Sequence, residues 1–394
     1  MKQLLQRYIR RFGEAFRKGD LILLLLCVVI TAFGCLVIAS TTNTMGAVSY
    51  VVTQVVATII GIFAYVMISS IDADWFAEKR TALVIFNVIL LLMLIPFGVT
   101  VSGNRSWLNF PIIPFNIQAA EICKITFILI MASVMASHQN RISSIPSVIH
   151  MVIHLGILAV LNLVLSGDAG VTLIFVFIFI GMTITGGVKL IWYLVAGGAT
   201  ALVAPLAWNY LLGDYQKYRI QVLFDPSLDP TGIGPRYHTV RSLRSLTGGG
   251  MFGQGLFQGH RTQTPNALFA QHTDYIFSAI GEELGFLGCA LVLVMLGLVV
   301  ARVFWVGWRS QDYMRRLICF GAGSALIFQI CINVGMCIGV MPVIGLTLPF
   351  ISYGGSSIVT IYAMLGLVSG VYARPASTSH ERYIRPPYMN RTLR

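Results

Sequence analysis

One aspartate, followed after a short interval by two glutamates, marks the segment best suited to chemistry. Residues 271–277 read QHTDYIF, and the helix expected to follow takes Glu282 and Glu283 into an apolar stretch. Carboxylates are costly to insert into a membrane, so they usually mark a site there rather than a scaffold. Asp274 lies where a long polar loop re-enters the bilayer. A base at that depth could meet a substrate with a hydrated head and a lipid tail.

A second pair of charges, Glu121 and Lys124, lies within an apolar segment. Residues three apart are neighbours on one helical face, and Gln118 lies one turn before them. An acid–base pair inside a membrane should face the bundle interior or a water-filled cavity. A structural ion pair that orients the helices would explain both charges equally well.

The longest connection, residues 213–272, is polar and contains several turn-forming Asp-Pro and Gly-Gly pairs. A loop of this length in a compact protein is usually functional or disordered. Its apolar residues predict that part of it packs as short amphipathic helices lying on the membrane. The loop also contains a basic cluster suited to a phosphate or carboxylate ligand, although incidental charge on a solvated loop is the alternative. The cluster comprises Lys217, Arg219, Arg236, Arg241, Arg244 and Arg261.

Two other outer connections have unusual residues. Arg105 is the one basic residue of the short outer loops, and Trp107 beside it either contacts a ligand or anchors the chain at the interface. Residues 341–357 contain two prolines and three glycines at membrane depth. Irregular backbone is tolerated there only if it is buried in protein or lines a cavity. We expect this segment to be a re-entrant wall of a binding site, with a plain helix kink as the alternative.

The composition places these segments in a membrane protein. The 394 residues are 56% hydrophobic and 11% charged, whereas soluble domains have about 25% charged residues. A helical span needs about 20 apolar residues, and the apolar stretches predict an all-α membrane protein of ten transmembrane helices. The predicted spans are 20–40, 48–70, 80–100, 117–137, 146–166, 169–186, 188–212, 273–306, 316–341 and 353–373.

The net charge of +12 reflects topology rather than binding to nucleic acid. Most basic residues fall in the tails and in the loops of one side, which the positive-inside rule assigns to the cytoplasm together with both termini. This side would also attract anionic membrane lipids. We predict a basic tail at 1–19, a single ten-helix domain at 20–373 and a second basic tail at 374–394. One large extracytoplasmic loop, at about 213–272, separates helices 7 and 8.

Cysteine and histidine placement gives no sign of a metal or disulfide. The seven cysteines all fall in predicted spans without a C-x-x-C pair. His150 and His154 share a helical face but lack a third ligand nearby, so no metal site is predicted. The first span is expected to be a retained anchor rather than a cleaved signal peptide.

These motifs, in this order, resemble the SEDS family (shape, elongation, division and sporulation) over nearly the whole chain. The most specific stretches are residues 271–285 and residues 342–357, PVIGLTLPFISYGGSS. Two Asp-Pro pairs, at 225–226 and 229–230, support them. The chain departs from the family pattern at residues 270–271, where Ala-Gln replaces the usual Pro-Glu. The motif at residues 253–259 resembles RodA, whereas the motif at residues 345–350, GLTLPF, resembles FtsW. The chain is therefore ambiguous between the two, with a RodA-like member slightly favoured.

The resemblance implies a ten-span peptidoglycan glycosyltransferase of the bacterial cytoplasmic (inner) membrane. Such proteins polymerise lipid II, the undecaprenyl-pyrophosphate-linked disaccharide pentapeptide, outside the membrane, for cell shape or division. They work beside a class B penicillin-binding protein that cross-links the strands. By this resemblance, Asp274 corresponds to the essential acid of the family.

We therefore expect Asp274 to accept the proton of a GlcNAc 4-hydroxyl, in a reaction that inverts the anomeric centre. The predicted substrate-binding residues are Arg105, Trp107, Glu121, Lys124, Arg241, Arg244, Arg261, His272, Glu282 and Ser356. No cofactor is firmly predicted, and a divalent cation, Mg²⁺ or Mn²⁺, is the alternative. Two other functions stay open. One is a flippase for lipid-linked precursors, in which Glu121 and Lys124 would be the intramembrane charges used in translocation. The other is a non-catalytic scaffold that activates the penicillin-binding protein.

Overall fold

The computed structural model describes residues 16–101, 104–109, 116–210, 213–234 and 236–374. The basic tails expected at 1–19 and 374–394 lie almost wholly outside these residues. Their boundaries stay predictions.

Within the described residues, nine helices are long and apolar enough to cross a membrane. They are α2 (Leu21–Thr41), α3 (Ala47–Ser69), α5 continued by α6 (Arg80–Leu92 and Leu94–Phe97), α7 (Ala119–Ser137), α8 (Ile145–Ser166), α10 (Leu190–Tyr210), α13 (Ile276–Arg309), α14 (Tyr313–Cys337) and α15 (Gly355–Ala373). A shorter apolar helix, α9 (Ala169–Thr185), occupies the position of the sixth predicted span. Three small elements connect them: η1 (Asn43–Met45), α4 (Ala73–Glu78) and η2 (Gln139–Arg141).

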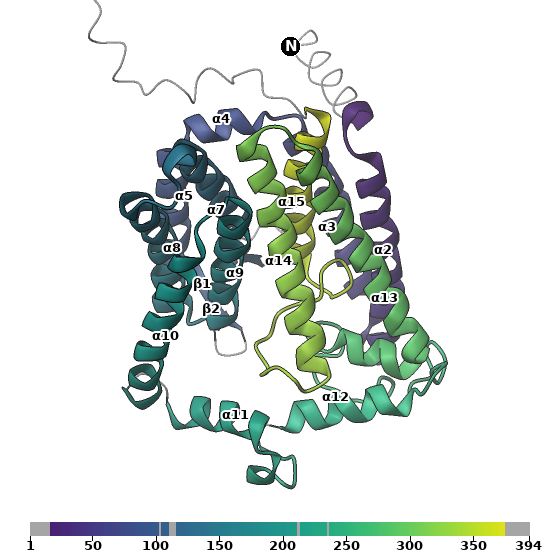
Figure 1. The fold of residues 1–394 in the computed structure, drawn as a ribbon. Coiled ribbons are helices and arrows are strands. Elements are labelled where there is room, and N and C mark those ends of the chain that lie inside the picture. Colours follow the sequence, from purple (N-terminus) through teal and green to yellow (C-terminus); the bar gives the residue numbers. More distant parts are fainter. Residues whose placement is uncertain (1–15, 102–103, 110–115, 211–212, 235, 375–394) are drawn as a thin grey trace, which may run out of the picture.

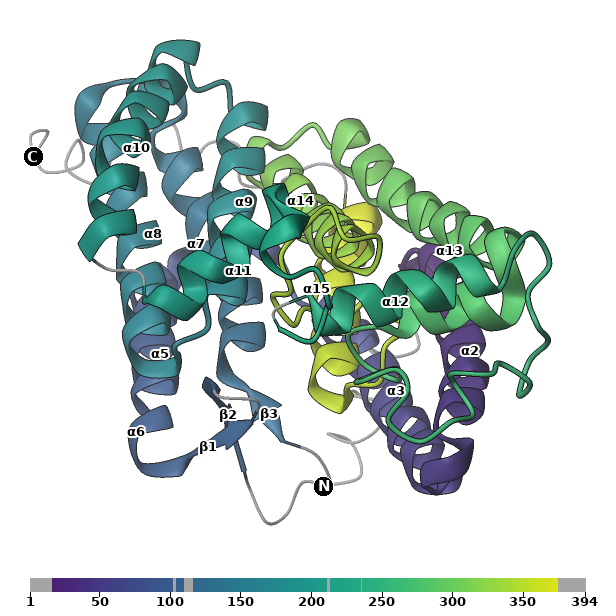
Figure 2. The ribbon, with the colours of Figure 1, turned by 90° about the horizontal axis from the view of Figure 1, so that it is seen from below.

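The helices form two groups, which are visible in Figures 1 and 2. One group contains α5 and α7 to α10, and the other contains α2, α3 and α13 to α15. The groups meet where α14 packs on α7 and α9, and where α15 packs on α7. Most residues of α7, α14 and α15 are buried, so these three helices form the centre of the bundle.

The connection after α6 contains a small sheet that the all-α prediction lacks. Its three antiparallel strands, β1 (Gly98–Val101), β2 (Asn104–Leu108) and β3 (Ile117–Gln118), lie in the order β1-β2-β3. The pairing satisfies backbone groups of a segment that is too short and irregular to continue either neighbouring helix. The fold is therefore mostly helical rather than all-α.

The long polar loop folds over one end of the bundle, which is the lower end in Figure 1 and the near end in Figure 2. It contains α11 (Asp214–Phe224), η3 (Pro226–Leu228) and α12 (Tyr237–Gly248). The prediction of short helices within this loop is confirmed. Helix α12 packs on α13, and the hydroxyl of Ser242 donates to the carbonyl of Cys337 at 2.7 Å.

Helix α13 is interrupted at Gly285, which the sequence pattern did not predict. Gly285 has φ 69° and ψ −165°, a combination that is essentially restricted to glycine. The glycine-rich residues 249–255 replace the missing helical hydrogen bonds. The amides of Gln254 and Gly255 donate to the carbonyls of Glu282 and Glu283 at 3.0 and 2.9 Å. On the other side of the break, the amides of residues 286 and 287 donate to the carbonyls of residues 250 and 251.

We predict that Gly285→Ala destabilises the protein strongly. An added Cβ would lie 2.4 Å from the amide nitrogen of Gly253 and 2.6 Å from the carbonyl oxygen of Met251, so the backbone would have to move. Strain of this kind costs about 1–3 kcal/mol even without the clash. Thermal unfolding in detergent measures the loss. Gly297→Ala in the same helix is the matched control, because nothing lies within 4 Å of its added Cβ. Equal melting temperatures for the two variants would contradict the close packing of residues 249–255 against Gly285.

Candidate active site

Asp274 lies in the turn that immediately precedes α13, and its side chain is half-buried. A Cβ added to Gly345 would lie 3.6 Å from its Oδ2, and Gly345 itself is exposed. The carboxylate therefore faces the irregular segment 342–354, at a place that is open beside Gly345. This segment lies within residues 341–357, for which a re-entrant wall is predicted, and it precedes α15.

Asp168 is a second acid of the site, and the sequence analysis missed it. It caps the N-terminus of α9, where its Oδ1 accepts from the amide of Val171 at 3.1 Å. Its Oδ2 accepts from Gln118 Nε2 at 3.3 Å and from the Ser106 hydroxyl at 3.5 Å. The available signal was an aspartate at the predicted start of a helix. The sequence pattern did not predict the contacts of Asp168 with Gln118 and Ser106, which lie 50 and 62 residues away in the chain.

Burial raises the pKa of Asp274 to about 6, and the negative charge of Asp168 contributes further to this rise. Burial also raises the pKa of Asp168, with the charge of Glu121 acting in the same direction. A buried carboxylate near another acid binds protons more readily than one in water. A pKa near the working pH is what a general base needs, and such shifts are concentrated at functional sites.

The predicted pair of Glu121 and Lys124 is formed and buried. Lys124 Nζ lies 2.9 Å from Glu121 Oε2, and the same oxygen accepts from the Thr360 hydroxyl of α15 at 2.9 Å. Each residue of the pair is 3% exposed. Ser356 lies at the same junction, where its hydroxyl accepts from the amide of Gln118 at 3.2 Å. The pair thus lies inside the bundle. Gln118 connects this region to Asp168, because its amide donates to Ser356 and its side chain donates to Asp168.

His272 and Trp107 also lie near these groups. The half-buried ring of His272 packs at 5.1 Å from the ring of Tyr50 and 5.8 Å from that of Tyr353. Burial lowers the pKa of His272, which favours the neutral ring. Trp107 is half-buried and pairs with Gln118 in the sheet.

The other predicted binding residues contact backbone rather than the acidic cluster. Arg105, which is exposed, donates to the carbonyls of Ile95 at 2.7 Å and Gly98 at 3.2 Å. Arg261 donates to the carbonyl of Arg244 at 2.9 Å, and its own amide donates to Glu282. Arg261 thus links α12, through the carbonyl of Arg244, to α13, through the carboxylate of Glu282.

Arg241 has a similar role within the loop. Its guanidinium donates to the carbonyls of Asn266 and Ala267 and lies 4.1 Å from the ring centroid of Tyr237. The guanidinium groups of Arg241 and Arg261 therefore bind backbone carbonyls of the loop rather than Asp274.

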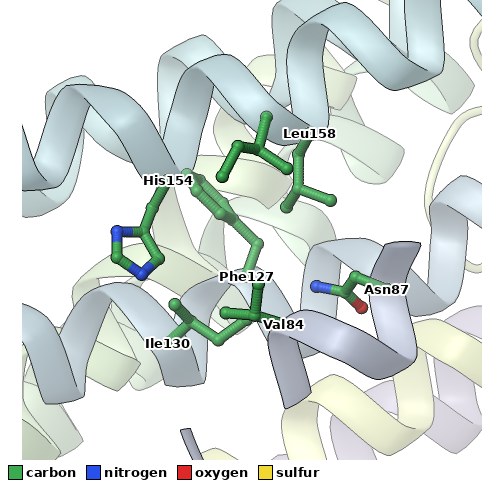
Figure 3. A pocket seen from close by; sticks show the side chains of 7 residues that line it. Val84, Asn87, Phe127, Ile130, His154 and Leu158 are labelled. Carbon is green, nitrogen blue, oxygen red and sulfur yellow. The ribbon is translucent and has the colours of Figure 1, made fainter. Parts of the chain in front are cut away.

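A separate small cavity of about 10 Å³ lies between α5, α7 and α8 (Figure 3). Its lining is apolar apart from Asn87 and His154. No carboxylate lines it, so it is unsuited to the base chemistry expected of Asp274. In the described part of the chain, no group of three or more His, Cys, Asp or Glu side chains could hold a metal ion.

Sequence comparison identifies relatives of the whole chain. Residues 19–376 match the family model of cell cycle proteins named for FtsW, RodA and SpoVE. A Trichlorobacter lovleyi protein named "Probable peptidoglycan glycosyltransferase FtsW" is 32% identical over 369 residues, which are 90% of this chain and 93% of that protein. Peptidoglycan glycosyltransferase MrdB of Escherichia coli K12 is 31% identical over 317 residues, covering 79% of this chain and 82% of its own.

Two solved structures share the fold. One comes from a study of the structural coordination of polymerization and crosslinking by a peptidoglycan synthase complex. It matches with a TM-score of 0.78 and 26% identity, over 91% of this chain and 99% of that chain. A mutant of RodA, the rod shape determining protein of Thermus thermophilus, matches with a TM-score of 0.68 and 25% identity over the same shares.

We predict that Glu121→Gln or Lys124→Met alone costs about 3 kcal/mol or more of stability, because each leaves one buried charge unpaired. The double variant should recover at least half of the larger loss, since it removes both charges. Unfolding of the purified protein in detergent gives the three values, and a double-mutant cycle gives the coupling. Single losses below about 1 kcal/mol, as for a surface pair, would contradict the buried pairing.

Proposed function

The chain belongs to the FtsW, RodA and SpoVE family of cell cycle proteins, and on this premise we propose that Asp274 is the base of a peptidoglycan glycosyltransferase that polymerises lipid II. Relatives over most of the chain have this activity in their names. The observation that supports the base is a half-buried carboxylate, raised in pKa to about 6, beside an irregular wall and a second acid.

The reaction is a single displacement at the anomeric carbon of the donor sugar. A hydroxyl oxygen of the acceptor sugar forms the new bond to that carbon, while the bond to the polyprenyl pyrophosphate oxygen breaks. Asp274 takes the hydroxyl proton, because a neutral hydroxyl is a poor nucleophile. The pyrophosphate leaves with the electron pair of the broken bond. One displacement inverts the anomeric centre and needs no covalent enzyme intermediate.

The leaving pyrophosphate requires nearby hydrogen-bond donors. Arg105 is suited to this role, because it is exposed and a guanidinium has five donor hydrogens, of which two contact backbone carbonyls. A divalent cation, Mg²⁺ or Mn²⁺, stays a prediction, because nothing in the structure tests it.

We further propose the orientation of the chain in the membrane. The short helix α9 is the sixth of ten spans, and both termini lie in the cytoplasm of a bacterium. The end of the bundle covered by α11 and α12 then faces outward, where the glycan is assembled. A class B penicillin-binding protein is the proposed partner, supported by the likeness to a chain of a peptidoglycan synthase complex.

We predict that Asp274→Asn abolishes polymer formation from lipid II by the purified protein with its partner, because asparagine cannot accept the proton. The variant should still bind lipid II. Asp225→Asn is the matched control, since Asp225 is exposed and its Oδ1 accepts from the amide and hydroxyl of Ser227 within the loop. Full polymer formation by Asp274→Asn would remove this residue from the chemistry and favour the scaffold alternative.

We predict a single acid limb in the pH dependence of kcat/KM, centred near pH 6, because kcat/KM reports the ionisation of the free enzyme. The base works only when ionised, and its raised pKa means that half of it is protonated at about pH 6. The rate should level off above this value and fall about tenfold for each pH unit below it. Polymer yield measured between pH 4.5 and 8 tests this. An unchanged rate at pH 4.5 would show that another group takes the proton.

A further inference from the structure

Three consecutive backbone carbonyls, ending at Asp274, each accept a hydrogen bond from outside their own segment. The carbonyl of His272 accepts from the amide of Tyr353 at 2.8 Å. The carbonyl of Thr273 accepts from the hydroxyl of Ser352 at 2.7 Å. The carbonyl of Asp274 itself accepts from Asn333 Nδ2 at 2.9 Å. The turn that presents the carboxylate is therefore held from one side at every peptide unit.

Asn333 connects this turn to the irregular wall. Its Nδ2 donates both to Asp274 and to the carbonyl of Leu346, the latter at 2.7 Å. Asn333 lies in α14 and is fully buried. Since Gly345 beside Leu346 approaches the Asp274 carboxylate, one side-chain amide fixes the spacing between the acid and the wall that faces it.

Gln54 also holds the wall, through hydrogen bonds at both ends of its side-chain amide. Its Nε2 donates to the carbonyl of Ser352 at 3.1 Å, and its Oε1 accepts from the amide of Gly354 at 3.2 Å. Gln54 lies in α3 and is fully buried. Both ends of its amide thus pair with the backbone on either side of Tyr353, which in turn donates to His272.

The wall needs such support because part of it is strained. Phe350 has φ +67°, a value at which a bulky side chain is an outlier. Such a conformation persists only where the surroundings over-determine it. The buried ring of Phe350 packs on Tyr362 with centroids 5.8 Å apart. The hydroxyl of Ser352 adds a second restraint by accepting from the amide of Leu348 at 2.8 Å.

We propose that Asn333, Ser352 and Gln54 are positioning residues, which set the place and the hydration of the Asp274 carboxylate without touching the substrate. The inference rests on the proposed function, because it assigns these residues to the same reaction. Asn333 and Ser352 donate directly to carbonyls of the turn, whereas Gln54 acts through the wall on either side of Tyr353. Catalysis is sensitive to displacements of the base of about 1 Å. The three residues form one unit, since α3, α14 and the wall all converge on the same turn.

The test uses the full chain with its partner and compares Asn333→Leu, Ser352→Ala and Gln54→Leu. We expect kcat to fall roughly tenfold to a hundredfold in each, with KM for lipid II unchanged within about twofold, because substrate contacts are retained. The acid limb of kcat/KM should also move to lower pH, since a loosened carboxyl gains water and its pKa falls. The other ionisable groups near Asp274, namely Asp168, Tyr275 and Cys337, are the same in every variant.

Two controls separate positioning from general destabilisation. Asn87→Leu removes a buried amide of α5 whose hydrogen bond to Thr126 lies outside this unit, so it should lower the melting temperature but leave kcat and the acid limb unchanged. Ser352→Thr keeps the hydroxyl and should restore most of the activity lost in Ser352→Ala.

Folded Asn333→Leu and Ser352→Ala with wild-type kcat and pH profile, beside an inactive Asp274→Asn, would overturn the positioning role and leave the proposed reaction standing. An equal loss of kcat in Asn87→Leu would overturn it as well. Polymer formation by Asp274→Asn would instead overturn the proposed reaction itself.

Discussion

The structure depends on one constraint, which is that backbone polar groups at membrane depth must find partners within the protein. Irregular backbone is nevertheless needed at the site, because a continuous helix would place Asp274 on a fixed face with no wall opposite. The chain meets this constraint by pairing irregular segments with one another. Residues 249–255 supply the hydrogen bonds lost at Gly285, and residues 342–354 hold the turn before α13.

Charged side chains obey the same constraint. Asp20 and Arg302 form two hydrogen bonds of 2.9 and 3.0 Å between the start of α2 and the far part of α13. Glu121 and Lys124 pair within α7 and are fixed to α15 by Thr360. Burial and a neighbouring acid raise the pKa of Asp274. This rise supports its proposed role as the group that takes the proton.

The family of the chain and the proposed role of Asp274 rest on different observations. The family follows from a match that covers residues 19–376. Relatives named FtsW and MrdB match at 32% and 31% identity, so the slight preference for a RodA-like member stays a prediction. Fold and family alone do not assign chemical roles to residues. The role of Asp274 is argued from its position, its neighbours and its ionisation.

The sequence by itself determined the apolar helices, the paired charges three residues apart on α7 and the place where a polar loop returns to the bundle. These features depend on local periodicity and on the cost of burying charge, which a sequence records directly. Only the tertiary structure decided that the charge of Asp168 acts on Asp274, that Arg241 and Arg261 bind backbone, and that Gln54 supports a wall 298 residues away. Such contacts join segments that are distant in the chain, and hydrogen-bond partners across a bundle leave no periodic pattern in the sequence of either partner.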